Sequence, residues 1–150
     1  MVDTLQTLRG VQFTVAVTTV AERGDLTHFE NPRQLMHSLG LTPSEYSSGG
    51  CRQQGSLTTT GNTHARRALV EGAWAYRYPA KVSRRLQLHL EQLPQAMQAS
   101  SWKAQVRLCK RYCQLMAKGK NANQVVVAMA QELVGFMWAI AKQVPVPPKA

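Results

Sequence analysis

Acidic residues are scarce in this sequence of 150 residues. Eight Asp and Glu stand against 18 Lys and Arg, which gives a formal net charge of +10 at neutral pH. The acids are scattered and do not form the cluster that a two-metal phosphoryl-transfer site requires. The four histidines are isolated as well. The sequence therefore predicts no metal site and no cofactor within this chain.

Cysteine is rare too. The three cysteines are an odd number without a repeating frame, which argues against a disulfide scaffold and predicts reduced thiols in a cytoplasm. The amino terminus has no cationic start followed by an apolar run, so no secretion signal is predicted. The most apolar stretch, residues 125–142, carries Gln131 and Glu132 in its middle. We expect a buried core helix there and no membrane partner.

The positive charge is concentrated between residues 61 and 120 of the chain. Between residues 61 and 120, twelve Lys and Arg are balanced only by Glu71 and Glu91. A basic run is most often a solvated helix face, but the near absence of balancing acids favours contact with a polyanion. Nucleic acid is the first candidate, and an acidic membrane surface is the second.

The periodicity predicts a mostly α fold. A helix is expected over residues 11–22 with Gly24 as its cap, and a second over 32–39 with Asn31 as cap and Pro32 at its first position. Four further helices are expected: one from residue 62, one from about 80 to 93, one from 95 to about 118, and one from about 122 to 142. The helix that begins at residue 62 would have one face made of Ala65, Leu69, Ala73 and Tyr76.

One segment of this pattern leaves two alternatives open. Residues 40–61 are rich in Ser, Thr and Gly and predict either an irregular loop or a short hairpin that pairs residues 46–50 with 55–59. In the helix over 95–118, the spacing of Trp102, Val106, Cys109, Tyr112 and Met116 predicts an apolar face. The chain is thus expected to have a short helical start, a Ser/Gly loop and a bundle of about four helices.

The first residues suggest a helix-hairpin-helix, whose tight glycine turn can offer backbone N–H groups to a phosphate. The usual second glycine of such a turn is replaced by Gln12, two residues after Gly10. A plain helical hairpin explains the pattern equally well.

The loop holds Ser47 and Ser48 directly before Gly49 and Gly50. Small neighbours let a phosphodiester approach a serine and leave N–H groups available to stabilise negative charge, although serine needs activation to act as a nucleophile. Flexible Ser/Gly surface turns are far commoner than such sites, so the loop alone does not decide between them.

The motif string as a whole is more specific. Its ordered elements are Phe29, Leu39-Gly40-Leu41, Pro43, Ser48-Gly49, Gly55, Gly61-Asn62 and Arg66-Arg67, followed by the segment "WKAQVRLCKRYCQLMAKGK". This string resembles the carboxy-terminal domain of insertion-sequence transposases of the IS110 class, particularly the IS1111 branch, which is related to the Piv/MooV invertases. The likeness extends from about Leu8 to Lys142.

The resemblance implies a DNA recombinase with two parts. An amino-terminal RuvC-like domain with a DEDD carboxylate set would bind divalent metal such as Mg²⁺, and the present domain would supply a nucleophilic serine, which carries over to Ser48. A structured bridge RNA would pair with donor and target DNA. We expect this chain to be a truncated or split transposase that needs a DEDD-domain polypeptide or an intact transposase as partner, and that assembles as a homo-oligomer.

The resulting division of the chain is a helix-hairpin-helix-like segment over residues 1–40, the serine-bearing domain over 41–142 and a flexible tail over 143–150. The expected function is DNA binding and serine-dependent strand cleavage and joining, and the alternatives are a nucleic-acid-binding module without chemistry or an inactive transposase remnant. The predicted nucleic-acid contacts are Gly49, Gly55, Arg66, Arg67, Lys81, Arg84, Arg85, Arg107, Lys110 and Arg111.

Overall fold

The computed structural model describes the backbone of residues 1–48, 51–57 and 63–143, and the side chains of residues 1–42 and 63–143. The described residues form seven α-helices, two short 3-10 helices and one two-stranded antiparallel sheet. In chain order these are α1 (Val2–Leu5), α2 (Phe13–Arg23), η1 (Leu26–His28), α3 (Pro32–Ser38), β1 (Pro43–Ser48), β2 (Cys51–Leu57), α4 (Thr63–Ala73), η2 (Trp74–Arg77), α5 (Arg84–Glu91), α6 (Gln95–Ala117) and α7 (Ala122–Gln143).

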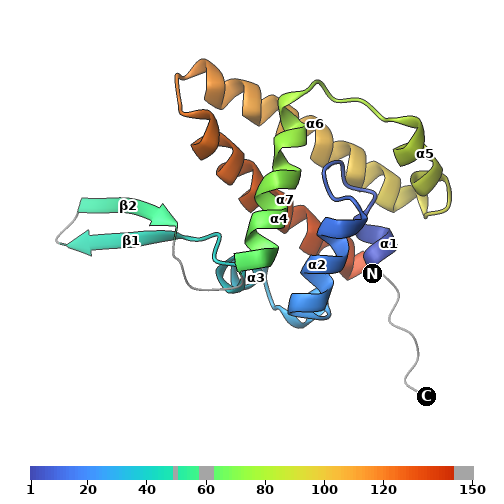
Figure 1. The fold of residues 1–150 in the computed structure, drawn as a ribbon, viewed down its shortest axis with the longest axis horizontal. Coiled ribbons are helices and arrows are strands. Elements are labelled where there is room, and N and C mark those ends of the chain that lie inside the picture. The colour runs from blue at the N-terminus through green and yellow to red at the C-terminus, as the bar shows by residue number, and fades with distance from the viewer. Residues whose placement is uncertain (49–50, 58–62, 144–150) are drawn as a thin grey trace.

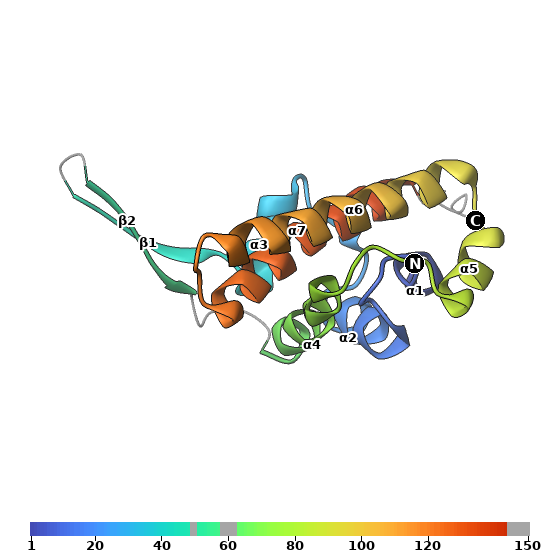
Figure 2. The same cartoon turned by 90° about the horizontal axis from the view of Figure 1, so that it is seen from above.

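The mostly α fold that the sequence predicts is confirmed, and α4 to α7 are the expected four helices after the hairpin. The long helices α6 and α7 lie side by side and antiparallel, joined by a turn in which Gly119 has a positive φ of 76°. The β1–β2 hairpin projects away from the helical body, as Figures 1 and 2 show from two directions.

Helix α7 is the centre of the body and contacts α1, α3, α4, α6 and η1. Its apolar residues occur at nearly every position of a wide face, and nine of them are buried, from Val125 to Ala141. By length and composition alone α7 could also cross a membrane, but half of its most apolar window is buried inside the protein. This burial is typical of a core helix, as the sequence predicts.

Local signals set most helix ends. Gly24 ends α2 with φ 67°, and the Asn31 side chain accepts a hydrogen bond of 3.0 Å from the Gln34 N–H at the start of α3. Asn121 does the same for Asn123 at 2.9 Å before α7. The predicted inner face of α4 and η2 is confirmed, because Ala65, Leu69, Ala73 and Tyr76 are all buried. The predicted cap Asn62 lies outside the described residues.

The second basic helix begins later than predicted. The sequence suggests a start near residue 80, but α5 begins at Arg84, where the Ser83 side chain accepts a hydrogen bond of 3.2 Å from the Leu86 N–H. Residues 78–83 instead form an extended connection. Pro79 disfavours a helical conformation at Tyr78, and the carbonyls of Tyr78, Pro79 and Lys81 accept hydrogen bonds from side chains.

The hairpin replaces the alternative of an irregular loop, with a different register from the one expected. Tyr46 pairs with Gln53 and Ser48 with Cys51, so residues 51–54 belong to β2 and do not form the connecting loop. The last pair encloses only residues 49 and 50, which matches the preference of antiparallel hairpins for two-residue connections.

The first turn of the chain packs against α4 through two glycines. A Cβ added to Gly72 would overlap the carbonyl oxygen of Gly10, and a Cβ added to Gly10 would overlap the carbonyl of Gly72. Gly10 also has a positive φ of 86°. The glycine of this turn therefore allows the close approach of the two backbones. The helix-hairpin-helix interpretation stays a prediction, since α1 is only four residues long.

Candidate nucleic-acid interface

Ser48 is the last residue of β1, at the end of the projecting hairpin that is farthest from the body. The base of the hairpin is anchored at Leu41, which is fully buried and whose carbonyl accepts a hydrogen bond of 2.5 Å from the Gln131 side chain of α7. The β1–β2 hairpin, which we call the arm, therefore starts from a fixed point in the core. Its outer end, with Ser48, extends into space that the helices leave open.

Gly55 lies where the two strands change register. Pro43 pairs with Leu57 and Glu45 with Gln54, so the single residue Ser44 faces two residues, Gly55 and Ser56. Such a β-bulge bends its strand and increases the local twist, and glycine inside a strand often marks a bulge. Gly55 is thus tied to the shape of the arm, while Gly49, the other predicted glycine contact, lies outside the described residues.

Two predicted arginines lie at the first turns of α4. Arg67 forms an exposed ion pair with Glu71, one helical turn later, at 3.1 Å. Arg66 is half-buried, so its side chain is held closer to the body. Because an exposed pair of this kind contributes little stability, Arg67 can exchange Glu71 for a phosphate at small cost.

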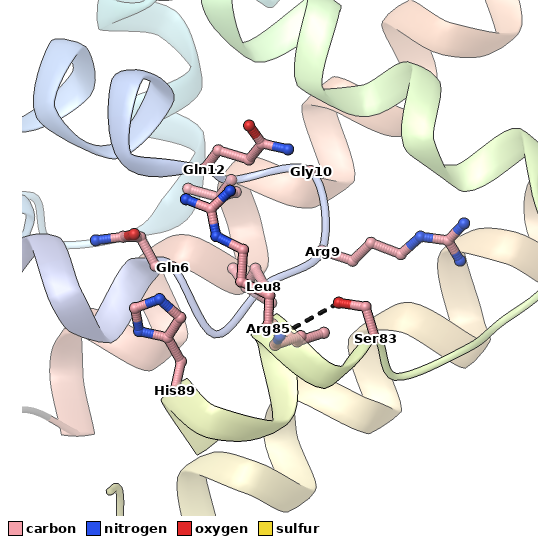
Figure 3. A pocket seen from close by; sticks show the side chains of 10 residues that line it. Gln6, Leu8, Arg9, Gly10, Gln12, Ser83, Arg85 and His89 are labelled. Atoms are coloured by element: carbon pink, nitrogen blue, oxygen red, sulfur yellow. Dashed lines mark hydrogen bonds between the residues drawn. The ribbon is translucent and has the colours of Figure 1, made fainter. Parts of the chain in front are cut away.

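A second group of cations lies on and before α5. Lys81, Arg84 and Arg85 are exposed and form no ion pair within the described residues. Arg85 and His89, one turn apart, line a small cavity of about 120 Å³ with the turn that holds Gly10. Figure 3 shows the Arg85 side chain pointing from α5 toward this turn, whereas Arg9 points away from it.

The extended connection that leads to these cations is fixed by side chains that donate to its carbonyls. Arg9 donates to the Pro79 oxygen at 2.7 Å, Gln105 of α6 to the Lys81 oxygen at 2.8 Å, and the Cys109 thiol to the Tyr78 oxygen at 3.3 Å. Burial raises the pKa of Cys109, which keeps the thiol protonated as a donor. These contacts hold the start of α5 against α6 although α5 buries none of its own residues.

The remaining predicted cations lie on α6. Glu132 of α7 forms ion pairs with both Arg107, at 3.2 Å, and Arg111, at 2.5 Å. Lys110 lies between them in sequence, is exposed, and has no ion pair in the part of the chain that the structure describes. One carboxylate thus orients two guanidinium groups on the exposed side of the α6–α7 pair, and the local charge stays positive.

The structure does not gather all of the predicted residues into one site. The hairpin with Ser48 lies at one end of the molecule and α5 with Arg84 and Arg85 at the other, as Figures 1 and 2 agree. The basic side of α6 runs between these ends, and α4 with Arg66 and Arg67 begins shortly after β2. An extended polyanion, rather than a small ligand, matches this distribution of charge.

Two groups of residues were not predicted from the sequence. The first group consists of Arg9, Gln105 and Cys109, which donate to backbone carbonyls. Their contacts join segments up to 100 residues apart, so no short-range sequence pattern predicts them. The exposed Trp102 was assigned to the wrong side of α6. The side that α6 buries is Met97, Ser101, Ala104, Gln105, Leu108 and Cys109, which leaves Trp102, Val106 and Met116 exposed. This buried face could not be recognised from apolar periodicity, because its members Ser101 and Gln105 are polar.

The described residues do not provide a cage for a divalent metal. Among them, no three His, Cys, Asp or Glu side chains converge. The Mg²⁺ that the resemblance implies therefore has no matching donor set in this part of the chain.

Comparisons with known proteins agree with the motif string. Residues 2–87 match the model of the Transposase IS116/IS110/IS902 family. The transposase named y4qE of Sinorhizobium fredii is 46% identical over 143 residues, which is 95% of this chain and 37% of that protein. A family 20 transposase of Pseudomonas aeruginosa is 26% identical over 139 residues, or 93% of this chain and 35% of its own length.

A shorter match involves the transposase for insertion sequence element IS1111A of Coxiella burnetii, which is 34% identical over 71 residues, 47% of this chain and 20% of that protein. The chain spans a little over a third of the length of the two relatives that it matches almost throughout. Since the family model covers more than half of its residues, the chain belongs to the IS116/IS110/IS902 family of transposases.

Proposed function

We propose that this chain is the serine-bearing and nucleic-acid-binding part of a transposase, and that Ser48 is the nucleophile that cleaves and joins DNA strands. The observation that carries the proposal is the place of Ser48 as the last residue of β1, at the outer end of an arm on a strongly basic body. A reactive group on such an arm can reach a phosphodiester while the body holds the nucleic-acid backbone.

The proposed step uses groups of this chain and of the DNA. As a bond forms between the Ser48 oxygen and the phosphorus, the hydroxyl proton leaves, one phosphorus–oxygen ester bond of the strand breaks, and the departing sugar oxygen takes up a proton. The strand is then held as a phosphoserine ester. Attack by another strand's hydroxyl reverses these changes, joins the new strand and returns Ser48.

The remaining parts of the proposal concern partners. The divalent metal would be held by a DEDD-domain polypeptide or an intact transposase, and a structured bridge RNA would select the donor and target sequences. Lysine and arginine on α4, α5 and α6 would then contact phosphates without reading bases. The assembly would contain several copies of the chain in a bacterial cytoplasm, since transposition joins several strands.

The test is a covalent adduct between protein and DNA. The chain is combined with a DEDD-domain polypeptide, bridge RNA and a nicked, end-labelled DNA substrate, and the labelled adduct is measured on a denaturing gel. We expect Ser48→Ala to abolish the adduct. Ser47→Ala is the matched control and should retain it, because successive strand residues lie on opposite faces. An adduct formed at the wild-type rate by Ser48→Ala would contradict the role of Ser48.

A nucleic-acid-binding module without chemistry is the second candidate, favoured by the exposed cations of α5 and α6. Binding of duplex DNA should then weaken with salt, with a log–log slope of about −0.9 for each phosphate contacted. Lys81→Gln with Arg84→Gln should reduce the slope by about two units. Salt-independent or undetectable binding would exclude this candidate and leave an inactive remnant.

A further inference from the structure

Helix α6 exposes an apolar strip that no other described segment covers. Trp102 is 45% exposed and Val106 is 41% exposed, and the two residues are four apart, so they lie on the same side of the helix. The opposite side, around Ala104 and Leu108, is fully buried against the body. The exposed strip is therefore a second face of α6, distinct from the face that stabilises the fold.

The three tryptophans of the chain differ in how they are held. Trp74 and Trp138 both pack against the core. Each also has a cation near its ring, Arg77 at 5.8 Å from Trp74 and Lys142 at 5.3 Å from Trp138. Trp102 belongs to neither arrangement within the described chain. The exposed part of the Trp102 indole is therefore available to contact a flat apolar group of a ligand.

The surroundings of Trp102 specify the chemistry of that contact. Trp102 and Val106 line an open groove of about 590 Å³ together with Lys103, Arg107, Lys110 and Arg111. Glu132 pairs with two of these cations, which leaves an excess of three positive charges along the groove. From Trp102 to Arg111 the helix rises about 13 Å, which corresponds to about four phosphates at the spacing of a stacked strand.

We propose that this groove binds a single-stranded segment of nucleic acid, with an unpaired base stacked on Trp102 and the following phosphates at Lys103, Arg107, Lys110 and Arg111. The inference rests on the proposed function and adds a strand type and a stacking residue to it. Unpaired bases stack on aromatic side chains regardless of sequence, and cations follow the backbone. A duplex cannot use Trp102 in this way, because its bases are already stacked on each other.

A second copy of the chain is a poorer occupant. Each copy carries a net charge of +10, and the groove itself is positive, so the surfaces of two copies repel each other at this place. A polyanion, in contrast, gains from the same charges by releasing its condensed counterions.

The experiment compares single-stranded and duplex probes of 12 nucleotides by fluorescence anisotropy with the full chain. We expect Trp102→Leu to weaken binding of oligo(dT) roughly ten- to hundredfold and to leave duplex binding unchanged. Trp102→Phe, which keeps an aromatic face, should retain most of the affinity. Oligo(U) is the corresponding RNA probe. A loss of affinity for either oligomer in Trp102→Leu supports the groove as a single-strand site.

Phe13 supplies a matched control. It is 59% exposed on α2, outside the groove, so Phe13→Leu should change neither kind of binding. Tryptophan fluorescence measures the stacking directly. Oligo(dT) should quench part of the emission of the wild-type chain, and this quenching should be absent in Trp102→Phe.

The outcomes separate this inference from the proposed function. An equal loss of single-strand and duplex affinity in Trp102→Leu would overturn the stacking role, and so would no loss at all with duplex binding intact. A change in sedimentation without a change in single-strand binding would overturn it in favour of a second copy. If the wild-type chain binds neither probe, the proposed function fails together with the inference.

Discussion

The helical body and the β1–β2 arm differ in what stabilises them. In the body, a continuous set of buried residues from α1 to α7 forms one core, and side chains such as Ser101 and Gln105 bind carbonyls of distant segments. The arm is a two-stranded hairpin that projects from this body after the buried anchor Leu41. Two isolated strands are marginally stable by themselves, so the arm depends on the body for its position.

This difference indicates that stability and proposed chemistry lie in separate parts of the molecule. Substitutions in the body should change the free energy of unfolding, and substitutions at the end of the arm should change strand cleavage alone. Three substitutions test that separation, beginning with the one that should affect stability most.

Gly72→Ala should produce the largest loss of stability. Its Cβ would overlap the Gly10 carbonyl oxygen, so α4 and the first turn must move apart. Overpacking of this kind costs about 1–3 kcal/mol, and the gain in helix propensity of about 1 kcal/mol opposes this cost. The difference is a net loss of about 0–2 kcal/mol, and we expect the upper end of this range because the obstructing atom is a backbone carbonyl oxygen. In urea-induced unfolding it should appear as a lower midpoint with an unchanged slope.

Gly135→Ala in α7 is the control for this prediction. A Cβ there would meet only the Met36 terminal methyl, at an ordinary distance of 3.7 Å. The same change of residue should therefore stabilise the protein, by up to about 1 kcal/mol, through helix propensity. If both variants were stabilised, the close Gly10–Gly72 contact would not exist in solution.

Gln105→Met should have a smaller effect. Methionine has a similar volume to glutamine, but it leaves the Lys81 carbonyl without the donor that now lies at 2.8 Å. Loss of one partner of a partly buried hydrogen bond costs about 1 kcal/mol. Thermal unfolding should detect this as a shift of roughly 2–4 °C for a chain of this size. Gln114→Met, on the exposed side of the same helix, should change the midpoint by far less.

Local signals predicted the parts of the fold that are local. Gly24 and Asn31 act on neighbouring backbone groups, so the sequence predicts the two helix ends that they set. The helix that begins after residue 62 has a regular apolar face, which the sequence also predicts. The hairpin was foreseen as an alternative, but its register was not. The mostly polar strands, PSEYSS and CRQQGSL, have no apolar alternation that would fix the pairing, and the short connection decides it.

Long-range contacts explain where prediction failed. The buried face of α6 includes Ser101 and Gln105, whose partners, the Thr7 and Lys81 carbonyls, are distant in sequence. Periodicity alone therefore placed Trp102 in the core. For the site, the sequence names the basic residues and the serine as candidates. Their separation onto two ends of the molecule depends on the connection over residues 78–83, which runs along α6 and is held there by Gln105 and Cys109.

Ser48→Ala should have the smallest effect on folding and is the sharpest test of the comparison. Ser48 is the last paired residue of an arm that projects from the body, and surface substitutions away from such packing usually change stability by less than about 0.5 kcal/mol. The melting temperature should therefore equal that of the wild-type chain, although the covalent adduct is lost. If Ser48→Ala lowers the melting temperature as much as Gln105→Met does, then the end of the arm contributes to the fold, and the loss of the adduct can no longer be assigned to the missing hydroxyl alone.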